Sequence, residues 1–183
     1  MIRLDHVCKS YGKKAVLVDL SLSLPEKGFC AVTGRSGSGK TTLLYLIAGL
    51  SRPDSGSVLR SGERISMVFQ EDRLLPWETA LQNASIAAPR ARAAAILTEL
   101  GLGADLDRYP RQLSGGMSRR TAIARALAAE AEVYIMDEPL KGLDAGTKAA
   151  ALCCIRRRTE GKLLIMVTHD PDETAGADLL IEL

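Results

Sequence analysis

The residues best suited to chemistry lie between Gly34 and Thr41, where the chain reads Gly-Arg-Ser-Gly-Ser-Gly-Lys-Thr. This run matches the phosphate-binding pattern G-x-x-x-x-G-K-[ST]. Glycines let backbone N–H groups close around phosphate oxygens, and the start of the following helix favours an anion. Lys40 would bring positive charge to the outer phosphates, and the Thr41 hydroxyl can ligate Mg²⁺.

The flanks of this loop support a binding role. An apolar, strand-like run precedes it at 29–33, and a run typical of a buried helix follows at 43–48. The alternative is a glycine-rich turn that merely precedes a helix, but Lys-Thr in register favours a nucleoside triphosphate site. We predict that this site consists of Gly34, Arg35, Ser36, Gly37, Ser38, Gly39, Lys40, Thr41 and Thr42.

Two carboxylates, Asp137 and Glu138, follow a short apolar run at 133–136. In open α/β sheets, ligands bind outside the carboxyl ends of the strands, so both acids should face the phosphate loop. Asp137 would hold Mg²⁺ directly or through water, and Glu138 could orient and deprotonate an attacking water. An acidic pair after a strand is alternatively a plain helix cap.

Residues 113–117 read Leu-Ser-Gly-Gly-Met at the expected start of a helix. A Ser and two glycines there form a second anion site, or simply a Ser cap with a glycine turn. The combination of the phosphate loop, this motif and the acidic pair resembles the ATP-binding cassette (ABC) ATPase family, over nearly the whole chain.

The resemblance assigns roles to five further residues. Tyr11 corresponds to the aromatic residue that stacks on adenine, although an ordinary strand-end tyrosine is the alternative. Gln70 would contact Mg²⁺ and the attacking water, and sense the partner subunit. Leu143 and Asp144 resemble the D-loop. His169 resembles the switch histidine that contacts the γ-phosphate, where a structural histidine is the alternative.

The resemblance also implies an assembly. Two copies would pack head to tail, so that Ser114, Gly115 and Gly116 of one copy cap the ATP bound by Lys40 and Thr41 of the other. ATP and Mg²⁺ are the implied cofactors, with catalysis assigned to Glu138, His169, Gln70 and Lys40 and metal binding to Thr41, Gln70 and Asp137. The implied partners are a second ATPase subunit and membrane permease subunits, with a solute-binding protein acting indirectly.

The stretch Leu74-Leu75-Pro76-Trp77 narrows the resemblance to importer ATPases of the nitrate, sulfonate and taurine group. Trp77 could anchor the permease, or it could pack inside the lobe with Leu75. The chain is shorter than a typical importer ATPase, and it reads Ser-Arg-Arg at 118–120, where that group more often has Arg-Gln-Arg. The resemblance places the protein in the cytoplasm, on the inner face of the membrane, and leaves the cargo open.

Strands that alternate with helices imply an α/β fold with a parallel sheet. The resemblance implies a P-loop NTPase core, with a mainly parallel sheet flanked by helices, an N-terminal antiparallel β-subdomain and a short helical lobe. We expect one domain over 1–183, with the lobe inserted at about 71–117. The patterning predicts antiparallel strands in the first thirty residues. It further predicts helical structure at 77–106, clearest at 91–100, and helices at 118–132 and 145–159. Strands are predicted at 65–69, 133–136, 163–167 and 179–183.

Composition limits other functions. The chain of 183 residues is 46% hydrophobic with a net charge of +2, which gives no general reason to expect nucleic acid as a partner. The alternative function is a soluble ABC ATPase that acts on DNA or ribosomes. Its support would be phosphate contacts by Arg156, Arg157 and Arg158, but a solvated basic face at the end of a helix is the favoured interpretation of these residues. No apolar run approaches membrane-spanning length, and the N-terminus has no signal-peptide pattern.

The four cysteines, Cys8, Cys30, Cys153 and Cys154, have no zinc-site spacing. We expect reduced thiols that serve as small apolar fillers.

Overall fold

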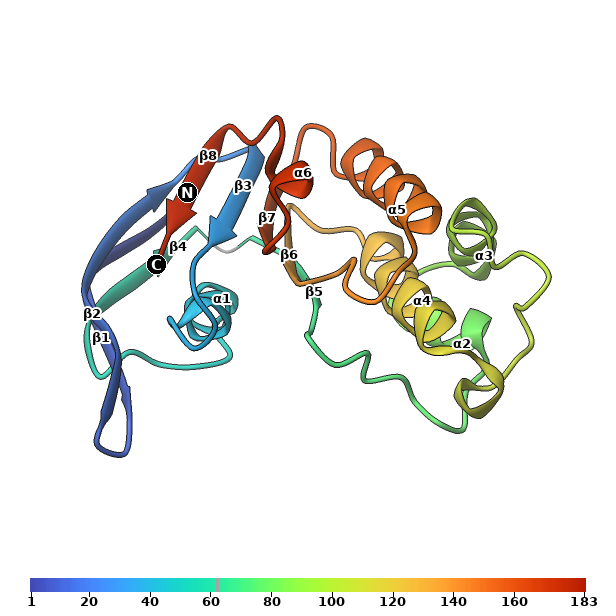
Figure 1. The fold of residues 1–183 in the computed structure, drawn as a ribbon, viewed down its shortest axis with the longest axis horizontal. Helices are drawn as coiled ribbons and strands as arrows, with labels where there is room; N and C mark the ends of the chain where they lie inside the picture. The colour runs from blue at the N-terminus through green and yellow to red at the C-terminus, as the bar shows by residue number, and fades with distance from the viewer. Residues whose placement is uncertain (62) are drawn as a thin grey trace.

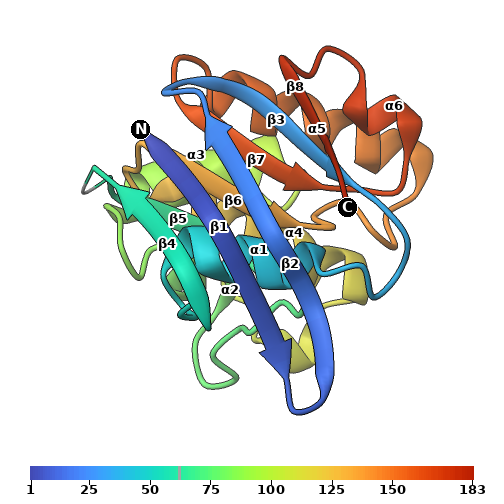
Figure 2. The same cartoon turned by 90° about the vertical axis from the view of Figure 1, so that its left-hand side faces the viewer.

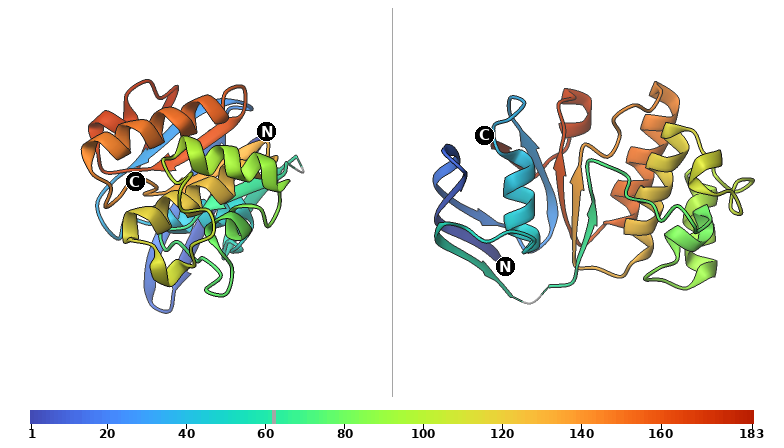
Figure 3. Two further views of the ribbon diagram at one scale, coloured as in Figure 1. Left: turned by 90° about the vertical axis from the view of Figure 1, so that its right-hand side faces the viewer. Right: turned by 90° about the horizontal axis from the view of Figure 1, so that it is seen from below.

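A computed structural model describes residues 1–61 and 63–183. Two sheets lie on either side of helix α1 (Lys40–Ala48), and the other long helices cover the far face of the second sheet, as the views in Figure 1 and Figure 3 show. Among the described residues, no helix is long and apolar enough to cross a membrane.

The first sheet is antiparallel, with the order β2-β1-β4. It consists of β1 (Ile2–Tyr11), β2 (Lys14–Leu24) and β4 (Ser55–Arg60), and Figure 2 shows its outer face. Its inner face buries apolar side chains, including Leu4 and Leu17, against α1. The predicted antiparallel β-subdomain is therefore confirmed for β1 and β2.

The second sheet is parallel, with the order β5-β6-β7-β3-β8. Its strands are β3 (Gly28–Thr33), β5 (Ile65–Val68), β6 (Val133–Asp137), β7 (Leu163–Val167) and β8 (Leu179–Glu182). Every residue of β6 and β7 is buried, as expected for strands covered on both faces. Successive side chains alternate between faces: Ile135 packs with α1, while Tyr134 and Met136 pack with the outer helices.

The outer helices are α2 (Ala80–Ala84), α3 (Arg90–Glu99), α4 (Gly115–Ala128) and α5 (Ala145–Arg158). The 3-10 turn η1 (Pro110–Gln112) lies between α3 and α4, and the short helix α6 (Pro171–Thr174) lies between β7 and β8. The helical prediction for 77–106 is confirmed in its clearest part, 91–100, which α3 matches, but the region is not one continuous helix. Thr79 caps α2 with a capping box, Pro89 stands at the start of α3, and Gly101 adopts a positive φ just beyond its end. Each of these residues interrupts a continuous helix.

Helix α4 also differs from the predicted range of 118–132. It begins at Gly115, because the Ser114 hydroxyl accepts a hydrogen bond from the Met117 amide and caps the first turn. Glycines do not prevent helix formation at such a capped end. The α/β class with a parallel core is confirmed, whereas the domain limits of 1–183 and the lobe limits of 71–117 stay predictions.

Candidate active site

The phosphate loop joins β3 to α1 through glycines that other residues could not replace without strain. Gly34, Gly37 and Gly39 all have positive φ. A Cβ at Gly34 would lie 2.3 Å from the carbonyl oxygen of Leu183, a distance that no real contact reaches. The loop therefore follows a path that brings its backbone close to its neighbours, as phosphate binding requires.

The polar side chains at the start of α1 turn inward. Lys40 is buried, and its Nζ donates to the carbonyl oxygens of Gly34 at 2.9 Å and Arg35 at 2.8 Å. Thr41 Oγ1 donates to Asp137 Oδ2 at 2.7 Å. Ser38 Oγ is buried with no hydrogen-bond partner among the described residues, which suits a loop built to surround an anion.

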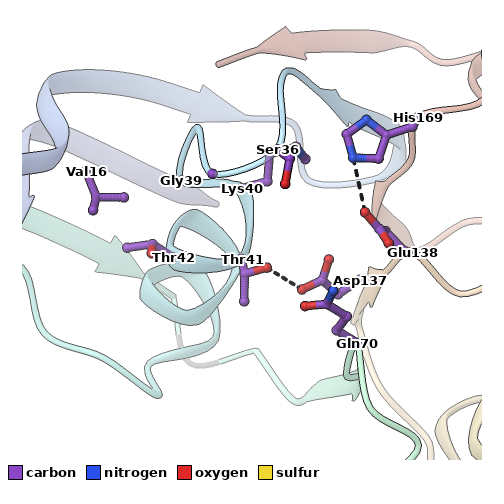
Figure 4. Close-up of a pocket in the computed structure, with 11 residues that line it drawn as sticks. Val16, Ser36, Gly39, Lys40, Thr41, Thr42, Gln70, Asp137, Glu138 and His169 are labelled. Carbon is purple, nitrogen blue, oxygen red and sulfur yellow. Dashed lines mark hydrogen bonds and ion pairs between the residues drawn. The ribbon is translucent and has the colours of Figure 1, made fainter. Parts of the chain in front are cut away.

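A cavity of about 270 Å³ opens where the loop meets the carboxyl ends of the parallel strands. Figure 4 shows side chains from five separate segments converging there: β2, the phosphate loop with α1, the end of β5, the end of β6 and the end of β7. The lining residues are Val16, Ser36, Gly37, Gly39, Lys40, Thr41, Thr42, Gln70, Asp137, Glu138 and His169.

The oxygen donors of this cavity fit Mg²⁺. Thr41 offers a hydroxyl, Asp137 a carboxylate and Gln70 a carboxamide, which are the ligand types that Mg²⁺ takes alongside substrate phosphates. Burial raises the pKa of Asp137, while the hydrogen bond from Thr41 opposes that rise. Within the described residues, no group of three or more His, Cys, Asp or Glu side chains is arranged to hold a metal ion.

Both carboxylate oxygens of Glu138 have partners. Oε1 lies 3.1 Å from His169 Nε2, and Oε2 accepts a hydrogen bond from Lys141 Nζ at 2.6 Å. Burial alone would raise the pKa of Glu138, but the hydrogen bond and charge of Lys141, together with His169 and Lys40, bring the pKa below its ordinary value. The backbone of Glu138 has a φ of +48°, a conformation that residues other than glycine rarely adopt.

The loop that carries His169 is fixed by its neighbours. Thr168 Oγ1 donates to Glu173 Oε2 at 2.6 Å and accepts from the Asp170 amide at 3.0 Å. Lys148 of α5 pairs with both Asp170 and Glu173, and these two hydrogen bonds raise the pKa of Lys148. His169 itself stays about half exposed and directed at Glu138.

Other predicted residues do not line the cavity. Tyr11 is 52% exposed at the end of β1. Ser114 and Gly115 are exposed at the start of α4, and Asp144 caps α5 by accepting from the Thr147 amide. A Cβ at Gly116 would lie 3.3 Å from Leu143, so the Leu-Ser-Gly-Gly-Met motif and the D-loop are neighbours within one chain.

Three residues near the cavity were not predicted: Val16, Lys141 and Lys148. Lys141 follows Glu138 by three residues, and this spacing could have indicated an ion pair. Neither Val16 nor Lys148 carries a signal in the sequence, because their proximity depends on how the first sheet and α5 pack.

The structure bears on two expectations about single side chains, and only the one for the cysteines was partly wrong. Trp77 is 68% exposed, so the alternative that it packs inside the lobe fails. All four cysteines are free, but Cys153 is exposed rather than an apolar filler. Burial, with a smaller contribution from Asp178, raises the pKa of Cys30 to about 11, which keeps that thiol protonated and unreactive.

A phosphate loop before a buried helix, with acidic, amide and imidazole groups at the ends of adjacent parallel strands, defines the class of P-loop nucleotide-binding domains. Residues 17–141 match the ABC transporter family. The chain belongs to this family.

Relatives agree with this membership. The chain is 42% identical over 194 residues to the aliphatic sulfonates import ATP-binding protein SsuB of Burkholderia pseudomallei (strain K96243), covering 99% of this chain and 59% of that protein. It is 44% identical to SsuB 3 of Paraburkholderia xenovorans (strain LB400), covering 90% of this chain and 69% of that protein. The chain thus spans about three-fifths of the length of the first of these relatives.

Solved structures share the fold. The dimeric ATP-binding cassette MJ0796 in a post-hydrolysis state, bound to ADP and Pi, superposes with a TM-score of 0.93 at 31% identity, covering 100% of this chain and 94% of that one. Another dimeric structure of MJ0796, described as a bacterial ABC transporter cassette, gives a TM-score of 0.90 at 32% identity.

Proposed function

We propose that this chain binds and hydrolyses ATP and powers an ABC membrane importer. The observation that carries the proposal is the convergence of the phosphate loop, Gln70, Asp137, Glu138 and His169 around one cavity. Relatives named as import ATP-binding proteins, and a fold shared with a cassette that holds ADP and Pi, support it.

Each residue has a distinct role in hydrolysis. The loop amides and Lys40 bind the phosphates, while Thr41, Asp137 and Gln70 hold Mg²⁺, which neutralises phosphate charge when bound. Glu138 accepts a proton from the attacking water. His169, 3.1 Å from Glu138, stands where one side chain can contact both the base and the outermost phosphate.

The active unit in this proposal is a head-to-tail homodimer. Ser114, Gly115 and Gly116 lie at a helix start outside the cavity, as groups that serve a second copy would. The structures of MJ0796 are dimeric, which supports a unit of two such chains. Tyr11, exposed at the end of β1, would stack on the adenine of its own subunit, and Leu143 and Asp144 would face the partner.

The proposed partners follow from the relatives. SsuB proteins are named for import of aliphatic sulfonates, so a permease with a sulfonate-type cargo, supplied by a solute-binding protein, is the first candidate. Such a subunit would lie on the cytoplasmic face of the membrane. The alternative of an ABC ATPase acting on nucleic acid or ribosomes gains nothing from the relatives described above, none of which has a name of that kind.

The hydrolytic part of the proposal is tested with Glu138→Gln. This variant keeps the shape of the side chain but removes the base, so turnover of ATP with Mg²⁺ should fall about 10²–10⁴-fold while ATP binding persists. Phosphate release and calorimetric binding measure the two effects. Hydrolysis at the wild-type rate would show that Glu138 is not the base.

The transport part is tested by placing a photo-crosslinking residue at position 77 in cells. Capture of a multi-span membrane protein, identified by mass spectrometry, supports the importer, and its identity narrows the cargo. A crosslinker at Leu180, which is also exposed but lies on β8, controls for random capture. Capture of a ribosomal protein, of nucleic acid or of nothing specific would refute the assignment.

A further inference from the structure

Gln70 lies in a segment whose backbone depends on two arginines of α4. Residues 69–73 belong to no helix or strand, so their carbonyl groups have no partners within a helix or a sheet. Arg119 Nη1 donates to the Phe69 carbonyl at 2.8 Å, and its Nη2 donates to the Gln70 carbonyl at 2.6 Å. Arg125 donates hydrogen bonds to the carbonyl oxygens of Asp72 and Arg73, each at 2.8 Å.

The Arg119 side chain is buried, and its positive charge is paired with a carboxylate. Arg119 is only 6% exposed, and its Nη1 lies 3.2 Å from Oδ1 of Asp72, which offsets its charge. A guanidinium presents its donors in a rigid plane, so one side chain can fix two successive carbonyl groups together. Because Arg119 is buried and donates charge-assisted hydrogen bonds to two carbonyl groups of segment 69–73, this side chain fixes the position of that segment.

The other side of the segment rests on the phosphate-loop helix. The Phe69 ring meets the Tyr45 ring of α1 edge to face, with centroids 6.3 Å apart. The Arg73 guanidinium stacks over Phe69 at 4.2 Å. The residues around Gln70 are therefore held between α1, which begins at the phosphate loop, and α4, which begins at Ser114.

We propose that Arg119 is a positioning residue for Gln70: it ties the Gln70 backbone to α4, so that the carboxamide reaches the metal and water only when α4 is in its place. The inference rests on the proposed function and deepens it. In this proposal, Arg119 links α4, whose first residues serve the partner subunit, to Gln70, which is a metal ligand in the same chain.

The test compares Arg119→Met with a matched control. Methionine keeps the length and apolar stem but removes every donor. Arg120→Met changes the adjacent arginine of the same helix, which donates to the carbonyls of Gly116 and Leu100 and to none in 69–73. For each chain, calorimetry gives the affinity for the non-hydrolysable analogue AMP-PNP in Mg²⁺ and in EDTA. The ratio of the two affinities measures the metal's contribution without any turnover.

Arg119→Met should reduce this ratio about tenfold, the worth of a charge-assisted hydrogen bond, with the affinity in EDTA unchanged. Arg119→Lys, which keeps the charge beside Asp72 but cannot bridge two carbonyls rigidly, should fall between and provides the test if the methionine variant does not fold. Arg120→Met should match wild type. In a Gln70→Ala background, Arg119→Met should have little further effect, because both act on the same ligand.

A wild-type ratio in both Arg119 variants, or an equal loss of affinity in Mg²⁺ and EDTA, would overturn the positioning role alone. A wild-type chain that fails to bind the analogue under either condition would instead refute the proposed function and this inference with it.

Discussion

At the carboxyl edge of the parallel sheet, Asp137 and Glu138 extend from a strand in which every residue is buried, and their side chains point into a shared cavity. In the helical lobe, Trp77 lies in a turn and Ser114 caps the start of α4, and both residues are exposed. The first region builds a cavity within one chain, whereas in the proposed function the second presents groups to another molecule. Under the proposed function, exposure of the side chain separates Asp137 and Glu138, which act within one chain, from Trp77 and Ser114, which act on a partner.

The largest effect should come from breaking the support of the first region. Ile135 is fully buried in β6, so Ile135→Ala should lower the free energy of unfolding by about 2–5 kcal/mol. Ile86→Ala, at an exposed position of the lobe, should change it by less than about 0.5 kcal/mol. Urea denaturation measures both. Equal losses would mean that the two regions are supported alike.

A charge at the start of α4 should separate folding from function. Gly115 has open space around its Cα, and a carboxylate at a helix N-terminus is favourable, so Gly115→Asp should keep the stability of the wild type. The same charge would repel a triphosphate held by the partner, and steady-state ATP hydrolysis should fall by about tenfold or more. AMP-PNP binding to the single chain should persist. Unchanged hydrolysis would contradict a role for this helix start in the assembled site.

The third prediction concerns the pH dependence of the base. Lys141 helps to hold the pKa of Glu138 below its ordinary value, so Glu138 stays deprotonated, and active, to lower pH. Lys141→Met removes that effect and leaves burial, which raises the pKa, so the acidic limb of the kcat profile should move to higher pH. Lys162→Met, before β7 at the opposite edge of the sheet, should leave the limb in place. A limb that stays put or moves down in Lys141→Met would refute the pairing.

The smallest effect is expected for Trp77. With 68% of its surface exposed, its loss removes little buried area, and Trp77→Ala should change the free energy of unfolding by no more than about 0.5 kcal/mol. Thermal and urea unfolding measure this directly. A loss of several kcal/mol would mean that the side chain supports the lobe rather than faces a partner.

The parallel sheet and its site were predictable because their signals are local. The apolar run at 133–136 ends in two acids, and the run at 163–167 leads to His169, so both the strands and the polar groups at their ends appear in sequence order. The glycines of the phosphate loop are equally explicit, since positive φ at Gly37 and Gly39 excludes most other residues.

The helical lobe was less predictable, because its alanine-rich sequence has little contrast between faces and because caps at Thr79 and Ser114 decide the ends. The contacts of Arg119 carried no signal at all. Its acceptors are backbone carbonyls, which every residue supplies, so no pair of side chains in the sequence marks the contact.

At position 138, the residue that would make the backbone more stable is not the residue that the proposed activity needs. A residue with a side chain held at a φ of +48° costs about 1–3 kcal/mol, and glycine would relieve that cost. Glycine would also remove the proposed base. A stability screen of this chain without an activity selection would therefore enrich proteins that are easier to fold and purify but unable to turn over ATP, and variation at position 138 records which pressure a population has faced.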